Sequence, residues 1–555
     1  MPLKYMKIKE LFRRNIWLIT IIFIASILRL WQLGSIPPHL TADEASLGYN
    51  AYSILKTGKD EYGEVLPLIF KSFGDYKPGL YIYSTVPFVA ALGLNELSVR
   101  LTASLAGIFV VYLAYLISKR LFEKKKIALC IAAVAAINPW LIYFSRGAWE
   151  ANLSLALTLA GILFFLKSFE KSRYLTISSI FFALTLLTYQ GAKLSTGIVV
   201  FLLVAVHLKK VVALPKKTLI ISFLAALLIS VPILLSLFGE KTGRLTVFSI
   251  FSYPRKAETL NSLLQQGQEK VGDVSYYFFH SESLNFGRAI LGRWFNHFSG
   301  RFLFFEGDWQ NPRHSAPNQG MLLLSDLILV ILGFASLVKV GWRNKTSFVW
   351  LWLILAPLPA ILSRDEVHAV RALNLAVPLV IVLGMGLERV LAAGKLAKFV
   401  FAVAFMASTI YFLDAYFVHL PKHNSIYWSY GYKQIVETVS PIQGNYKAVK
   451  VQQSYAQPYI YFLFYQKYDP AKYQAQARLV KSQFEGDVGL VEKLDNICFC
   501  AMDWPSQRGE EGTLFAADTI AIPPSDSSDE GKFALIKEIK YLNGLDTAFR
   551  IIEVK

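Results

Sequence analysis

Two adjacent carboxylates, Asp43 and Glu44, are the side chains of this sequence best placed for acid–base chemistry. They follow Thr41 at the start of a predicted helix that ends at Gly58. A carboxylate in the first turn of a helix stays ionised, so it can accept a proton from a hydroxyl group. Glu44 has a second explanation, because a threonine and a glutamate three residues later form a capping box. Both are catalytic candidates, and Asp43 is the stronger one.

A lysine in the same segment supplies the opposite charge. Lys77 precedes Pro78 and Gly79, and a proline at this position often starts a helix. An ammonium group beside a helix start can bind a phosphate. The alternative is a lysine whose side chain only reaches toward water from a membrane surface. The segment therefore offers a candidate base and a candidate phosphate ligand.

Arg364, His368 and Arg371 form a second cationic group. Their spacing of four and three residues predicts that they share one face of a helix. Arginine suits phosphate because its planar guanidinium binds two oxygens at once. The alternative is an anchor at the membrane interface with an ion pair to Asp365 or Glu366. We expect the three residues to bind a lipid phosphate.

A third group lies at the end of a long loop. Asp308, Arg313 and His314 occur in a polar stretch with glycine and proline, which is typical of loops that face substrates. Arg146, on a short loop of the same side, is a further candidate. His314 could ligate a metal, donate a proton or only bond to the backbone. The sequence shows no clear metal-ligand set, so no metal residue is predicted, and a divalent ion stays open as a cofactor.

A membrane-embedded scaffold must position these groups. Hydrophobic residues make up 54% of the 555 residues and charged residues 17%, which is too little polar surface for a large soluble enzyme. Apolar runs near the roughly 20 residues that a bilayer requires recur along the chain. We predict eleven spans, near residues 16–34, 97–118, 127–143, 150–167, 174–189, 194–208, 218–238, 319–340, 347–363, 367–393 and 396–418.

The positive residues indicate which side each loop faces. The formal net charge of +18 could indicate nucleic-acid binding, but the sequence contains no nucleic-acid-binding motif. The cations gather between apolar runs, as they do in the cytoplasmic loops of membrane proteins. If 79–94 lies in the interface, this pattern puts the N-terminus in the cytoplasm and the C-terminus outside. We therefore expect a multi-pass protein of the cell membrane with lipid partners and no nucleic acid. The clusters lie at 119–126, 167–173, 209–217, 339–345 and 395–398.

The expected fold is an all-α polytopic membrane protein with about eleven transmembrane helices and a small C-terminal α/β domain outside the membrane. The transmembrane part covers 1–418, with a first outer loop at 35–96 and a long outer loop at 239–318, and the C-terminal domain covers 419–555. Within it, Cys498 and Cys500 are interpreted as structural, and pairing or metal binding stays open. Strands are predicted at 446–451, 497–501, 519–522 and 549–554.

The order of these features resembles the GT-C superfamily of glycosyltransferases that use polyprenyl-phosphate sugars. The resemblance covers roughly residues 16–395 and is nearest to protein O-mannosyltransferases and the transferase that adds aminoarabinose to lipid A. It implies that Asp43 is a base or positions the acceptor, that Lys77 contacts the lipid phosphate, and that Glu150 is a second acidic residue. Glu150 is also explained as an ordinary helix-start glutamate. Gly79 and Ala372 depart from the residues common in the family.

The expected function is transfer of a hexose such as mannose, or of a pentose, from a polyprenyl-phosphate carrier to an acceptor hydroxyl at the outer face, with inversion. The acceptor is a glycolipid, a protein or a cell-wall polymer. A transporter or lipid flippase is the alternative, although it predicts ionisable groups at mid-membrane and paired repeats, and the sequence shows neither. A receptor with an outer sensing domain leaves the first-loop residues unexplained.

Overall fold

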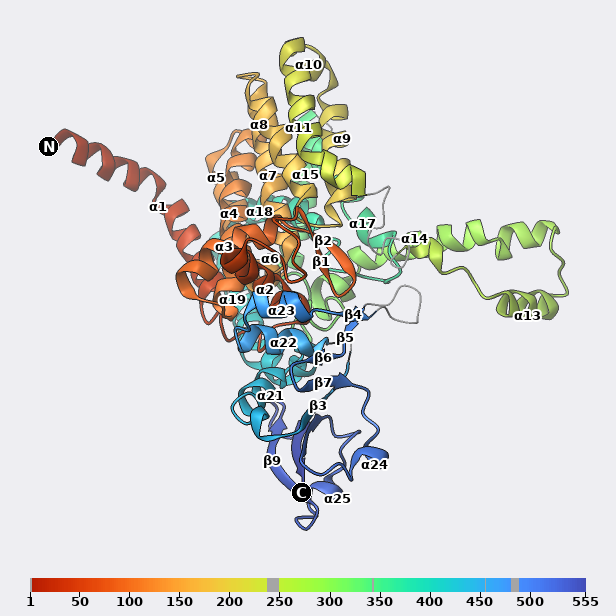
Figure 1. Ribbon diagram of the computed structural model, residues 1–555. Coiled ribbons are helices and arrows are strands. Elements are labelled where there is room, and N and C mark those ends of the chain that lie inside the picture. The colour runs from red at the N-terminus through yellow and green to blue at the C-terminus, as the bar shows by residue number, and fades with distance from the viewer. Residues whose placement is uncertain (1, 237–248, 342–343, 455, 481–488) are drawn as a thin grey trace.

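A bundle of helices and a mixed α/β unit lie at opposite ends of the molecule (Figure 1). The computed structural model describes residues 2–236, 249–341, 344–454, 456–480 and 489–555. The bundle consists of α1 (Pro2–Leu30), α4 (Glu96–Phe122), α5 (Lys125–Ile137), α6 (Pro139–Arg146), α7 (Glu150–Ser168), α8 (Tyr174–Leu186), α9 (Ala192–Val206), α10 (Leu208–Val212), α11 (Lys216–Ser236), α15 (Asp326–Val340), α16 (Asn344–Leu355), α17 (Leu358–Ile361), η4 (Leu373–Leu375), α18 (Ala376–Ala392), α19 (Lys395–Asp414) and η5 (Ala415–His419).

Several of these helices are long and apolar enough to cross a membrane. Within the described residues there are five, and the bent pair α5 and α6 makes a sixth. That pair turns by 53° at Asn138, whose side chain accepts a hydrogen bond from the Leu141 N–H and so caps α6. Four shorter apolar helices, at 15–30, 174–186, 192–206 and 346–361, overlap other predicted spans. The prediction of spanning helices is confirmed, whereas the number eleven stays a prediction.

The first outer loop contains a buried helix and a hairpin, α2 (Ala42–Thr57), β1 (Ile69–Ser72), β2 (Asp75–Pro78) and α3 (Leu80–Leu92). The predicted capping box is confirmed, because the Thr41 hydroxyl accepts from the Glu44 N–H and the Glu44 carboxylate accepts from the Thr41 N–H. Gly58 ends the helix in the left-handed conformation, with φ of 68°. Leu47 and Ala51 of this helix are buried, so this side of the helix packs against protein.

The long outer loop consists of helices that extend away from the body of the molecule (Figure 1). Most residues of α13 and α14 are exposed or half-buried. The final part of the loop returns to the bundle, where Phe302 and Leu303 are buried. The loop contains η1 (Ile250–Ser252), α13 (Ala257–Gly267), η2 (Tyr276–His280), α14 (Glu282–Phe298) and η3 (Arg301–Phe305).

The C-terminal unit is built on a six-stranded mixed sheet in the order β6-β7-β3-β8-β10-β9. The central strand β3 is parallel to β7 and β8, and the other pairs are antiparallel. Its elements are α20 (Leu420–Asn424), η6 (Ser425–Trp428), α21 (Tyr432–Val439), η7 (Gln443–Asn445), β3 (Ala448–Gln452), α22 (Pro458–Tyr465), α23 (Pro470–Gln476), β4 (Leu479–Val480), β5 (Leu490–Val491), β6 (Lys493–Leu494), β7 (Ile497–Cys500), α24 (Trp504–Gln507), β8 (Thr513–Ala517), α25 (Pro524–Ser527), β9 (Phe533–Lys540) and β10 (Thr547–Val554).

Three of the four strands predicted in this unit are confirmed, as β3, β7 and β10. The prediction of a strand at 519–522 is wrong, because these residues form a turn. The Asp518 carboxylate accepts hydrogen bonds from the N–H groups of Ile520 and Ala521. An aspartate that bonds to the following backbone in this way favours a turn over a strand ladder.

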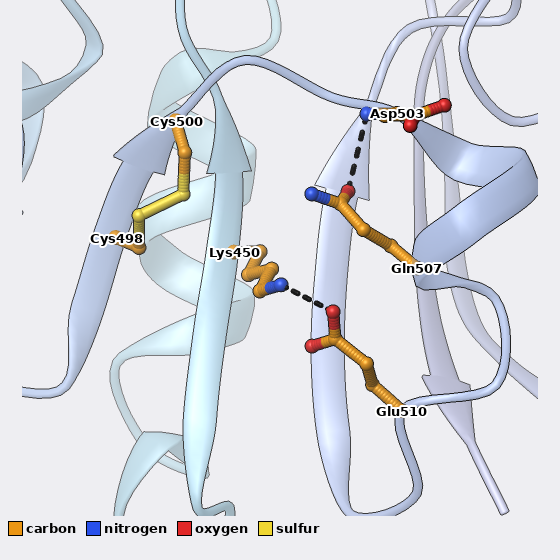
Figure 2. The surroundings of a disulfide bond; sticks show 6 residues. All are labelled: Lys450, Cys498, Cys500, Asp503, Gln507 and Glu510. Atoms are coloured by element: carbon orange, nitrogen blue, oxygen red, sulfur yellow. Dashed lines mark hydrogen bonds and ion pairs between the residues drawn. A yellow bond between two sulfur atoms is a disulfide. The ribbon is translucent and has the colours of Figure 1, made fainter.

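The sequence left open whether the two C-terminal cysteines pair with each other. In the structure a disulfide joins Cys498 and Cys500 along β7 (Figure 2). On the neighbouring strand β3, Lys450 donates to Glu510 at 2.6 Å. The disulfide and this ion pair therefore lie on adjacent strands of the sheet.

The first outer loop and the C-terminal unit share one hydrophobic core. Leu47 of α2 and Val99 of α4 belong to the same buried cluster as Ile460 of α22 and Ile551 of β10. Gly48 makes this packing possible, because a Cβ atom there would lie 2.5 Å from the Val99 side chain and 2.6 Å from that of Phe464. The helix that carries the two candidate carboxylates is therefore fixed between the bundle and the C-terminal unit.

Candidate functional site

Asp43 and Lys77, which are distant in the sequence, form an ion pair. Asp43 projects from the first turn of α2, and Lys77 lies on β2 of the hairpin. The Lys77 ammonium donates a hydrogen bond to Asp43 Oδ1 and lies 5.7 Å from the centre of the Phe73 ring. The Asp43 side chain is 59% exposed and that of Lys77 is 16% exposed. The pair is thus open to a ligand from the side of Asp43.

Charges around this pair keep both members ionised. The positive charge of Lys77 lowers the pKa of Asp43, and Arg313 lowers it further. Burial acts to lower the pKa of Lys77, but the charges of Asp43 and Glu150 outweigh it and raise that pKa. The Asp43 carboxylate is therefore available to accept a proton at neutral pH, although Lys77 weakens its basicity.

The charges of Glu150 and Arg371 both act on Tyr189. Glu150 is the first residue of α7, and Arg371 lies before η4. Burial raises the pKa of Tyr189 to about 12, Arg371 opposes this rise and Glu150 adds to it. Glu150 also raises the pKa of Lys77, so its charge acts on both Lys77 and Tyr189. Tyr189 was not among the sequence candidates, since a lone tyrosine between apolar runs carries no signal.

Glu44 follows Asp43 in the helix, and its carboxylate is occupied by contacts with other parts of the protein. Its side chain is 5% exposed and accepts from the fully buried Arg100 at 3.0 Å. It also accepts from the backbone N–H groups of Ala148, at 2.8 Å, and Thr41, at 3.0 Å. Arg100 in turn donates to three carbonyl groups of the chain before α2, those of Leu33, Pro37 and His39. Glu44 and Arg100 thus join α2, α4 and the loop before α7.

Arg146 has a similar structural position. Its guanidinium donates to the backbone carbonyls of Leu28, Trp31 and Ile36, and it lies 5.3 Å from the centre of the Tyr416 ring. These contacts tie the end of α1 to α6. Arg146 is buried, and its guanidinium donates to backbone carbonyls, so the geometry favours a scaffold residue over a substrate ligand.

The prediction that Arg364, His368 and Arg371 share a helix face is wrong. Residues 362–372 are not helical, and the helix begins only at η4. Side chains from other segments hold this backbone in place. The His368 N–H donates to His297 Nε2 at 3.2 Å, the Ala369 N–H donates to Asp308 at 2.8 Å, and Trp140 donates to the Ala369 carbonyl at 3.1 Å.

The two arginines of this loop differ in surroundings. Arg371 donates to Asp365 at 2.9 Å and its side chain is 17% exposed, whereas the Arg364 side chain is 48% exposed and lies 3.8 Å from Asp365. Only Arg371 is shown to act on Tyr189 beside Glu150. Arg371 is therefore the less exposed of the two arginines, and Arg364 lies at the surface.

Asp308, His314 and His368 form a compact group that could hold a metal ion. One ligand atom from each lies within 4.8 Å of the others, and His314 Nδ1 is 2.7 Å from Asp308 Oδ2. Burial lowers the pKa of both histidines, so both are neutral near pH 7, as metal ligands must be. This set was missed because its members come from two loops about 55 residues apart, with no ligand spacing to read.

The comparisons with known proteins agree with this architecture. The model of the dolichyl-phosphate-mannose-protein mannosyltransferase family matches residues 78–235, which is less than half of the chain. The fold resembles ArnT from Cupriavidus metallidurans in the apo state, with a TM-score of 0.57, 12% sequence identity and coverage of 97% of this chain and 98% of that one. No curated protein matches the sequence.

Two further solved structures are similar to this chain. ArnT from Cupriavidus metallidurans bound to undecaprenyl phosphate has a TM-score of 0.55 at 12% identity, with coverage of 97% of this chain and 98% of that one. The oligosaccharyltransferase AglB from Archaeoglobus fulgidus, in complex with an inhibitory peptide and a dolichol-phosphate, has a TM-score of 0.47 at 12% identity, with coverage of 82% and 64%. The resemblance to the GT-C superfamily is confirmed: the fold is similar to that of ArnT, and several helices are long and apolar enough to cross a membrane.

Proposed function

We propose that this protein transfers a sugar from a polyprenyl-phosphate carrier to an acceptor hydroxyl at the outer face of the cell membrane. The observation that carries the proposal is the ion pair of Asp43 and Lys77, which places a carboxylate and a cation side by side at an exposed site. The fold supports it, because similar ArnT structures include one bound to undecaprenyl phosphate. The donor sugar is a hexose such as mannose, or a pentose, and the acceptor is a glycolipid, a protein or a cell-wall polymer.

In the proposed reaction the acceptor oxygen attacks the anomeric carbon while the bond from that carbon to the phosphate oxygen breaks. Asp43 takes the proton of the acceptor hydroxyl, and the polyprenyl phosphate leaves with the bonding electron pair. Lys77 stabilises the charge that develops on the phosphate. A single displacement of this kind inverts the anomeric centre.

The geometry suggests how donor binding prepares the base. Lys77 now pairs with Asp43 and lowers its pKa. A phosphate that draws the Lys77 ammonium toward itself removes part of this effect, so the pKa of Asp43 rises and the carboxylate becomes a better base. Binding of the carrier and activation of the acceptor are therefore coupled through one lysine.

The remaining candidates take supporting roles in the proposal. Arg371 is the proposed second phosphate ligand, and its charge, like that of Glu150, acts on Tyr189. The charge of Glu150 raises the pKa of Lys77, and the charge of Arg313 lowers the pKa of Asp43. The group of Asp308, His314 and His368 fits a divalent cation, which when bound would supply positive charge near this site.

Replacing Asp43 by asparagine tests the proposal directly. Asparagine keeps the size of the side chain and removes the proton acceptor, so we expect the transfer rate to fall by ~10²–10⁴-fold. The assay uses membranes with this protein, a polyprenyl-phosphate sugar, and glycolipid or peptide acceptors. Glu64→Gln is the matched control, because Glu64 is an exposed carboxylate of the same loop, and this variant should keep normal activity. Near-normal transfer by Asp43→Asn would rule out Asp43 as the base.

A further inference from the structure

A large cavity lies at the end of the bundle opposite the C-terminal unit. Its volume is about 1090 Å³, and the ends of α4, α7 and α15 contribute to its lining. The length of helix α4 gives the distance between this cavity and the proposed active site. Glu96 at its start pairs with Lys433 of the C-terminal unit, whereas Lys119 near its end lines the cavity. At 1.5 Å per residue these positions are about 35 Å apart, which is roughly the thickness of a bilayer.

Positive charge dominates the lining of this cavity. Arg120 is neutralised by Glu170, with two hydrogen bonds of 2.7 and 2.9 Å. Within the part of the chain that the structure describes, Lys119, Lys124 and Lys339 have no ion-pair partner. The mutual repulsion of these cations favours an anionic occupant. The basic residues of the lining are Lys119, Arg120, Lys124, Lys167, Lys210 and Lys339, against the acidic residues Glu123 and Glu170.

Below the charged rim the walls are apolar. Leu116 of α4, Leu163 of α7 and Met385 of α18 line the cavity. A soluble anion gains nothing from such walls, whereas a phospholipid places its phosphate among the lysines and its acyl chains along the leucines. The expected cytoplasmic leaflet on this side also holds anionic lipids.

We propose that this cavity binds the headgroup phosphate of an anionic phospholipid. The site is separate from the proposed catalytic pair by the length of α4, so it is independent of the sugar-transfer proposal. Its occupant holds together the ends of helices whose cations otherwise repel one another. Lipid binding at this end thus stabilises the bundle without touching the reacting groups.

The experiment compares the full-length protein with two variants. The test variant carries Lys119→Gln, Lys124→Gln and Lys339→Gln. The control carries Lys209→Gln, Lys216→Gln and Lys217→Gln, which removes the same charge from the same end of the bundle but outside the lining. Native mass spectrometry measures binding of phosphatidylglycerol, phosphatidylcholine and, as the soluble source, inorganic phosphate, and thermal unfolding is followed in each lipid.

We expect phosphatidylglycerol to bind and to raise the melting temperature of the wild-type and control proteins, and phosphatidylcholine to do neither. Loss of three lysines, each worth roughly fivefold near an anionic membrane surface, should weaken phosphatidylglycerol binding by roughly 100-fold. Equal binding of the two lipids, or equal loss in the control variant, would overturn the proposal. Binding of inorganic phosphate without binding of phosphatidylglycerol would assign the cavity to a soluble anion and would also overturn it.

Discussion

Asp43 and Glu44 are consecutive residues with opposite surroundings. Glu44 is enclosed by Arg100 and by two backbone N–H groups, whereas the Asp43 side chain is mostly exposed and touches Lys77. The cause is helix geometry, since successive residues point about 100° apart around the axis. One residue therefore faces the protein and stabilises the loop, and its neighbour faces the space where a substrate can bind.

A third carboxylate of this loop provides a test by pH. Glu61 is fully buried beside Asn50, and burial, together with the charge of Asp60, raises its pKa to about 8, although the Asn50 hydrogen bond and the charge of Lys77 oppose this. The folded state thus binds a proton that the unfolded chain releases near pH 4.5. This contribution to stability is fully present below pH 4.5 and is lost as the pH rises through 8.

We therefore expect the melting temperature of the wild-type protein to fall as the pH is raised from 5 to 8.5. Glu61→Gln keeps a neutral side chain of the same shape, so its melting temperature should depend less on pH over this range. Thermal unfolding in detergent at several pH values measures the difference. Identical pH profiles for the two proteins would show that Glu61 is ionised in the folded state.

At the scale of elements, the position of the site depends on how α2 is held between other helices. Its amino-terminal end presents Asp43, and the hairpin of β1 and β2 brings Lys77 to it. Neither the pairing of these strands nor the packing of α2 against α22 is visible in local sequence. Both arise because buried residues of distant segments form one core.

Gly48→Ala tests this packing. The added methyl group would lie 2.5 Å from Val99 and 2.6 Å from Phe464, and such overpacking typically costs about 1–3 kcal/mol. We expect a lower melting temperature and a larger loss of transfer activity than the stability change alone explains, because α2 carries Asp43. Gly197→Ala in α9, where no atom lies within 4 Å of the new Cβ, is the control and should be neutral or stabilising. An unchanged melting temperature of Gly48→Ala would show that α2 can move away from α4 and α22 at little cost.

At the scale of the whole molecule, the two ends of the bundle carry different features. The proposed catalytic pair and the disulfide lie toward the C-terminal unit, and disulfides persist in oxidising compartments. The lysine-rich cavity lies at the other end. The predicted orientation places the C-terminal unit outside and this cavity in the cytoplasm.

Cysteine labelling checks this orientation. Leu545→Cys places a thiol on a side chain that is 82% exposed in the C-terminal unit, and Lys216→Cys places one at the opposite end. A membrane-impermeant maleimide should label Leu545→Cys in intact cells and Lys216→Cys only after permeabilisation. The background is low, because Cys130 is buried and the other two cysteines are paired. The reverse labelling pattern would contradict the predicted topology.

The sequence by itself determined the features that depend on local chemistry and on periodicity. The capping box of Thr41 and Glu44, the left-handed Gly58, three of the strands and the membrane-spanning helices could be predicted, since each depends on residues that are neighbours along the chain. The order of residues in the first loop also indicated the resemblance to the GT-C superfamily. The number of spans was less certain, because short and bent helices such as α5 and α6 do not match a fixed length.

Only the tertiary structure decided which predicted residues meet. It paired Lys77 with Asp43, turned Glu44 toward Arg100, and replaced the expected helix at Arg371 by a loop. It also gathered the basic residues of the cavity from several helix ends. The physical reason is that these contacts join segments far apart in the chain, and burial of a common core sets their geometry more strongly than any local preference does.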